Sequence, residues 1–246
     1  MSMHRLKHWI LAAGVAAILA PAAYAQKEAA AKGPSISKAV AKQVKTAQDA
    51  IKKEKWADCV AALQSTEAVA DKPPYDVFAV AELLGFCAAR NGDTAGAEAA
   101  FSKGLEAGFL DDANRLIRYK QLLQLNYNLK AYERAAGFGE QAIAAGNTEE
   151  PVALLTAQSY YLLNDFKRTT GFIDKWLAAL QSRGEKPAEI ALQLYVSSCS
   201  KLDDDTCILK ALEKQLEFHP RPETPGNITL VLLRNASEGN TLNVFR

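Results

Sequence analysis

The sequence predicts an all-α fold, a solenoid of helix-turn-helix repeats with about five copies and a partial sixth. Three observations support this prediction. Apolar residues recur at helical spacing, as in Leu84, Ala88, Ala97 and Phe101. Polar turns such as Asn91-Gly92-Asp93 separate the helical stretches. The pattern also returns at a nearly constant interval, and such hairpins bury their apolar faces only by stacking on neighbouring copies.

The clearest copy lies at Leu83–Phe101, with the sequence LLGFCAARNGDTAGAEAAF. Gly92 suits the left-handed position that commonly follows a helix C-terminus. Asp93 or Thr94 can cap the helix that comes next. Gly85 has no side chain, so the two backbones can approach closely, and Phe101 fills the space that opens further along the pair.

The order Leu84-Gly85, Gly92-Asp93, Ala97 and Phe101 resembles one unit of the tetratricopeptide repeat (TPR) family, whose period is about 34 residues. With Gly92-Asp93 as the reference, the small residue after each turn falls at 59, 97, 135, 169 and 208, so the spacings are 38, 38, 34 and 39 residues. The resemblance covers residues 37–220 and implies a right-handed superhelical solenoid whose first helices line a concave groove.

The third and fourth copies depart from the family pattern. Gly139 stands where an aromatic residue is usual, Thr169 takes the small position, and Trp176 takes another. Gly137 and Gly171 fall inside second helices, where glycine costs about 1 kcal/mol relative to alanine. The alternative to a TPR-like solenoid is a generic bundle of amphipathic helical hairpins.

Residues 1–25 have the form of a secretory signal peptide. Arg5 and Lys7 precede an apolar run at 9–20, and Ala23-Tyr24-Ala25 ends it with small residues. The run is shorter than the roughly 20 residues that a membrane span requires. We expect cleavage between Ala25 and Gln26 and a periplasmic or secreted bacterial protein without a stable membrane anchor. The alternatives are a buried helix or a membrane anchor.

The rest of the chain divides into three parts. Residues 26–36 are expected to form a flexible leader, residues 37–220 the solenoid, and residues 221–246 a partial terminal repeat. In this last part, Ile228, Val231 and Leu232 share one helical face, and Gly239-Asn240 breaks the pattern. A solenoid normally ends in a polar capping helix. We therefore expect either a truncation at Arg246 or a partner that covers this end.

The charge of the chain argues against nucleic acid as a partner. Removal of residues 1–25 takes away two of the 29 basic residues and leaves 27 against 28 acidic ones, for a formal charge of −1. Nucleic-acid-binding domains usually carry a strongly basic face.

The four cysteines form an even set in an exported chain, which permits disulfides. Cys199 lies near the end of one predicted helix and Cys207 in the first turn of the next, so their Cα atoms can come within about 7 Å. We expect a Cys199–Cys207 disulfide. Cys59 occupies the small position that faces its own hairpin, so we expect a packed thiol there rather than a bond to Cys87. The alternative is that all four are buried thiols.

No motif indicates catalysis, a metal site or a cofactor. His219 is the only histidine left after residues 1–25, and it follows a predicted helix beside Pro220. The run Asp203–Asp205 can attract a cation, but no further ligand follows at EF-hand spacing. We expect it to form a turn with an N-cap, and the pair Asp111-Asp112 to begin a helix. Phosphate-binding glycine loops are also lacking.

We therefore expect a non-catalytic protein–protein interaction scaffold or adaptor. It would bind a peptide segment or helix of another cell-envelope protein in the concave groove. The alternative is an enzyme-accessory or envelope-machine subunit with an unidentified carboxylate site. TPR domains that clamp a C-terminal carboxylate carry Lys and Asn on their first helices. The corresponding positions here are Val44 and Gln48, so we expect no such clamp.

The predicted partner-binding residues lie on the first helices of the second, third and fourth copies: Phe86, Arg90, Lys120, Gln124, Tyr127, Gln158 and Tyr161. Tyr127 and Tyr161 occupy the same repeat position, so they should stand in a row. Aromatic residues and arginine are frequent in binding hot spots. The alternative for Phe86 and the two tyrosines is packing between adjacent repeats.

Overall fold

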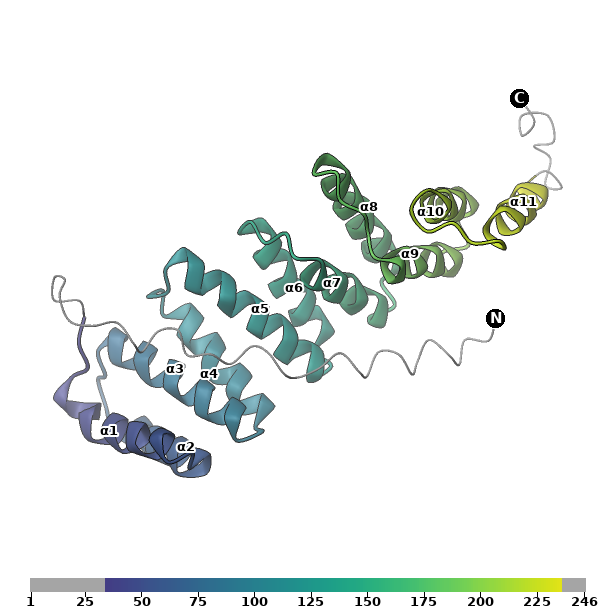
Figure 1. The fold of residues 1–246 in the computed structure, drawn as a ribbon. Helices are drawn as coiled ribbons and strands as arrows, with labels where there is room; N and C mark the ends of the chain where they lie inside the picture. Colours follow the sequence, from purple (N-terminus) through teal and green to yellow (C-terminus); the bar gives the residue numbers. More distant parts are fainter. Residues whose placement is uncertain (1–33, 236–246) are drawn as a thin grey trace. The chain divides into compact units, whose positions relative to one another are not determined.

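A computed structural model describes residues 34–235, in which eleven α-helices and one 3-10 helix follow one another (Figure 1). The signal peptide and most of the leader predicted above lie outside the described residues, as does the segment 236–246. Successive helices pack against each other in pairs. The pairs are α1 (Lys38–Lys52) with α2 (Trp56–Gln64), α3 (Pro74–Arg90) with α4 (Thr94–Glu106), α5 (Asp112–Asn128) with α6 (Tyr132–Ala144), α7 (Glu150–Leu162) with α8 (Phe166–Ser182), and α9 (Glu189–Lys201) with α10 (Asp205–Phe218); α11 (Thr224–Asn235) packs on α10, and the 3-10 helix η2 (Ser65–Ala68) follows α2.

Each hairpin turns through one residue in the left-handed conformation. These residues are Glu54, Gly92, Lys130, Asn164 and Asp203, with φ between 52° and 79°. The backbone N–H of the residue that follows bonds the carbonyl five positions earlier, as Asp93 does to Ala88 at 2.9 Å. This is the hydrogen bond of a Schellman motif. The turns recur after 38, 38, 34 and 39 residues, which confirms the interval predicted from the sequence.

Polar residues at the turns begin the next helices. The carboxylates of Asp93, Asp165 and Asp204 accept hydrogen bonds from backbone N–H groups in the first turns of α4, α8 and α10. Ser37 caps α1 and Asp111 caps α5 in the same way. Each cap satisfies a donor that a helix N-terminus otherwise leaves free. Asp204 therefore has the structural role expected for the Asp203–Asp205 run.

The core runs continuously along the described helices. The small position after each turn is buried, with 0% exposure at 59, 97, 135 and 169 and 7% at 208. Three half-buried residues, Val60, Phe138 and Ile143, each pack against two neighbouring clusters of buried side chains. The described chain therefore has an all-α, TPR-like helical-repeat fold. None of its helices combines the length and apolar composition needed to cross a bilayer.

Two disulfides connect the helices. Cys199 is bonded to Cys207 across the turn between α9 and α10, with their Cα atoms 5.3 Å apart. The expectation of a thiol at Cys59 is wrong, because Cys59 of α2 is bonded to Cys87 of α3, with Cα atoms 6.0 Å apart. Helix α2 packs against both α1 and α3. A side chain in its small position can therefore reach the following repeat as well as its own hairpin partner.

Candidate protein-binding face

The predicted partner-binding residues all lie on α3, α5 and α7, and we call this set the first-helix face. Arg90 and Gln124 are exposed, and the other five residues are half-buried. The face is therefore a mixture of accessible groups and groups that also hold neighbouring repeats together.

Phe86 and Arg90 pack on Trp56, the first residue of α2. The rings of Phe86 and Trp56 meet edge to face, with centroids 5.8 Å apart. The Arg90 guanidinium lies 4.9 Å from the centre of the Trp56 ring, a cation–π arrangement. Both residues therefore contact the preceding repeat, which is the packing role that the sequence left open for Phe86.

Tyr127 and Tyr161 have equivalent surroundings. Each ring packs edge to face on the aromatic residue that begins the next helix, Tyr132 at 5.6 Å and Phe166 at 5.3 Å. Each hydroxyl points to the following first helix: Tyr127 lies 3.5 Å from the Gln158 side-chain oxygen, and Tyr161 lies 2.9 Å from the Ser197 hydroxyl. The two side chains thus connect α5 to α7 and α7 to α9.

Burial, with a smaller contribution from Tyr132, raises the pKa of Tyr127 to about 12. Its hydroxyl therefore stays protonated at neutral pH and can donate a hydrogen bond.

Lys120 and Gln124 lie along the same helix as Tyr127. The Lys120 ammonium is 2.7 Å from a Glu149 carboxylate oxygen at the start of α7. Gln124 donates a 3.0 Å hydrogen bond to Asn128 of its own helix. The amide of Gln124 faces solvent, since the residue is exposed. The face therefore offers amide, hydroxyl and ammonium groups on consecutive first helices.

The remaining polar residues singled out in the sequence have structural partners. His219 places its Nε2 atom 2.8 Å from the Pro187 carbonyl oxygen. Asp205 pairs with Arg234 of α11 through a 2.9 Å hydrogen bond. Val44 is buried in the core, so its position offers no polar group to a ligand. Within residues 34–235, no group of three or more His, Cys, Asp or Glu side chains is arranged to hold a metal ion.

Sequence reasoning missed the residues that position this face. Trp56, Tyr132 and Phe166 each stand two residues after the left-handed residue of their turn. Their common position could have been found by aligning the turns. Ser197, the partner of Tyr161, could not have been found in this way, because serine is unremarkable in an amphipathic helix.

The fold resembles that of known repeat proteins. No protein-family model matches the chain, and neither does any curated protein. A tetratricopeptide repeat protein from Parabacteroides merdae is 13% identical over 82% of this chain and 76% of its own, with a TM-score of 0.46. YrrB, a TPR protein with an unusual peptide-binding site, is 10% identical over 78% and 92%, with a TM-score of 0.49. PilW, a type IV pilus biogenesis factor, is 14% identical over 77% and 81%, with a TM-score of 0.43. At these identities the likeness concerns the fold alone.

Proposed function

We propose that this chain is a non-catalytic scaffold that acts in the bacterial periplasm and binds a peptide segment or helix of another cell-envelope protein along its first-helix face. The observation that carries the proposal is the repetition of Tyr127 and Tyr161. Both occupy one repeat position and, with Gln158, place hydrogen-bonding groups along successive first helices. Residues 1–25 supply the reason for export, since they have the form of a signal peptide.

The test must separate binding from folding. The tyrosine rings pack against Tyr132 and Phe166, so alanine at either position would also disturb the repeat. Gln124 is the better probe because it is exposed and bonds only within its own helix. Gln141 of α6 is an exposed glutamine on a second helix and provides the matched control.

A photo-crosslinking amino acid at position 124 in cells, followed by mass spectrometry, should identify the partner. Gln124→Arg should then lower the affinity for this purified partner at least tenfold, and Gln141→Arg should leave it unchanged. Equal affinities for both variants would place the binding site elsewhere. Size-exclusion chromatography of the native periplasmic extract separates a free adaptor from a permanent envelope-machine subunit.

A further inference from the structure

A cavity of about 700 Å³ lies between α6 and α8, and none of the seven residues of the first-helix face lines it. Its volume falls in the range found for the ligand-binding pockets of proteins. Ala153 and Tyr160 of α7 form part of its wall. Along α8 the lining extends from Asp165 to Arg183, a helical length of about 27 Å. We call this cavity the α6–α8 groove.

Residue size explains why α6 and α8 leave this space. A Cβ atom added at Gly139 would lie 1.9 Å from the Thr156 hydroxyl, so α6 packs very closely on α7. Larger residues fill the contact of α7 with α8, where the rings of Tyr160 and Phe172 lie 6.2 Å apart. A Cβ atom added at Gly171, which lines the groove, would meet nothing within 4 Å.

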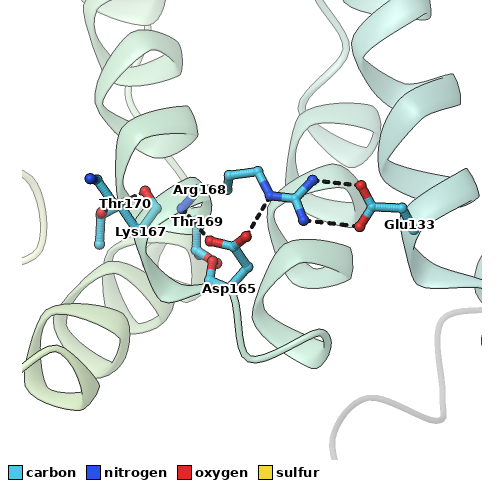
Figure 2. A network of polar contacts seen from close by, with 6 residues as sticks. All are labelled: Glu133, Asp165, Lys167, Arg168, Thr169 and Thr170. Atoms are coloured by element: carbon cyan, nitrogen blue, oxygen red, sulfur yellow. Dashed lines mark hydrogen bonds and ion pairs between the residues drawn. The ribbon is translucent and has the colours of Figure 1, made fainter.

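Arg168 lies at one end of the residues that line the groove, and Figure 2 shows the polar contacts of its side chain. Its guanidinium makes two hydrogen bonds to Glu133 of α6, at 2.6 and 2.9 Å, and a third to Asp165 at 2.6 Å. It also lies 4.8 Å from the centre of the Tyr160 ring. This contact joins the first turns of α6 and α8 beside the end of the groove that Arg168 lines.

The wall of the groove is apolar, whereas charged side chains also line it. Ile143, Ala144, Phe172, Trp176 and Ala179 give an apolar wall.

Among the charged lining residues, Arg168, Arg183 and Glu149 are held in ion pairs, with Glu133, Glu185 and Lys120 respectively. Lys167 and Lys175 make no ion pair within the described chain, and with Gly171 they fall at four-residue steps on one stripe of α8. Glu140, which lines the groove from α6, makes no ion pair there either, so the unpaired negative charge lies on the opposite side. The α8 side of the groove therefore carries unneutralised positive charge.

We propose that the α6–α8 groove binds an amphipathic helix of a partner protein, with an apolar stripe against Phe172 and Trp176 and carboxylates beside Lys167 and Lys175. A helix fits better than an extended peptide because the walls are helices, whose backbone groups are bonded internally and offer no ladder to a strand. The site shares no residue with the first-helix face, so its partner differs from the one proposed above.

The proposal can be tested with designed peptides and the full mature chain. One peptide has about 18 residues, or about 27 Å of helix, with leucines on one stripe and glutamates on its flanks. The second carries lysine in place of each glutamate. The acidic peptide should bind at least tenfold more tightly by fluorescence anisotropy, and the double variant Lys167→Glu, Lys175→Glu should reverse this preference.

Gly171→Leu should fill the groove and lower the affinity for the acidic peptide at least tenfold. Gly137→Leu is the matched control, since Gly137 lies inside α6, faces open space and does not line the groove. Equal binding of both peptides, or unchanged binding to the Gly171→Leu protein, would overturn the proposal. Binding of decanoate, a fatty acid, without binding of the acidic peptide would also overturn it, because the occupant would then be a small apolar ligand. Concentration-dependent dimers that Gly171→Leu abolishes would overturn it too, because the occupant would then be a second copy of the chain.

Discussion

Gly85 and Phe101 share one space between α3 and α4. A Cβ atom at Gly85 would lie 2.3 Å from the Phe101 ring. We expect Gly85→Ala to destabilise the protein by about 1–3 kcal/mol, since overpacking outweighs the gain in helix propensity. Gly137→Ala should instead raise stability by up to about 1 kcal/mol, because Gly137 faces open space. Urea unfolding of both variants measures the difference.

The same space can be filled in another way. The first repeat has Ala47 and Leu63 at the positions of Gly85 and Phe101, and both are fully buried. Phe101→Leu should therefore rescue part of the loss caused by Gly85→Ala. Additive effects in this double-mutant cycle would contradict the shared space.

The left-handed turn residues offer a second prediction. Lys130 adopts φ 61°, a conformation that costs a residue with a Cβ atom about 1 kcal/mol or more. Lys130→Gly should raise stability by roughly 0.5–1 kcal/mol after the extra flexibility of glycine in the unfolded chain is counted. Asn164→Gly should gain less, because asparagine tolerates this conformation better. Thermal unfolding of the two variants should rank them in this order.

These turns also show what the sequence could predict. Gly92 is the only glycine among the five turn residues, and the other four were placed by counting from it. The count succeeded because the apolar spacing fixes where two helices can pack, whichever residue turns between them.

At the scale of the helix, Arg168 predicts a dependence of stability on pH. Its hydrogen bonds hold the pKa values of Glu133 and Asp165 below their usual range. Carboxyl groups with lowered pKa values stabilise the fold above their unfolded pKa, and this stabilisation disappears as the pH falls through the folded pKa. The groups are exposed, so Arg168→Gln should cost only about 0.5–1 kcal/mol at pH 7.

The difference between the wild type and Arg168→Gln should shrink as the pH falls through the lowered pKa values of the two folded carboxyl groups, and it should vanish once both are protonated. It should also shrink at 1 M salt, which screens exposed pairs. Lys175→Gln, which removes an exposed charge of the same helix that contributes to neither pKa shift, provides the control. A difference that persists at low pH would assign Arg168 a packing role instead.

The two surfaces differ in how far the sequence could locate them. Tyr127 and Tyr161 share a repeat position, so an alignment of turns was enough to place them together. The α6–α8 groove depends on how far apart two helices stand. Gly139, Thr169 and Trp176 were visible as departures from the repeat, but their combined effect on helix separation follows only from the packed structure.

Over the whole molecule, pairing between repeats was the hardest feature to predict. Cys59 and Cys87 are 28 residues apart, and only the packing of α2 on α3 brings them together. Cys199 and Cys207 are 8 residues apart across one turn, so local geometry was sufficient to suggest that pair. Local periodicity predicts hairpins well and the contacts between hairpins less well.

The two disulfides should therefore act over different distances. On the chain-entropy model, closing the longer loop contributes about 3.6 kcal/mol and the shorter about 2.6 kcal/mol. In a repeat protein, stability is transmitted through the interfaces between neighbours. We expect the double variant Cys59→Ala, Cys87→Ala to lose hydrogen-exchange protection throughout α1 and α2, because their link to the second repeat is cut.

The double variant Cys199→Ala, Cys207→Ala should lose protection mainly around the turn between α9 and α10. This turn is already held by its own hydrogen bonds, including the 3.3 Å bond from the Asp204 N–H to the Cys199 carbonyl. Hydrogen exchange followed by mass spectrometry resolves the two regions in one experiment. Equal loss along the whole chain in both variants would mean that the repeats unfold as a single cooperative unit, in which neither disulfide has a local role.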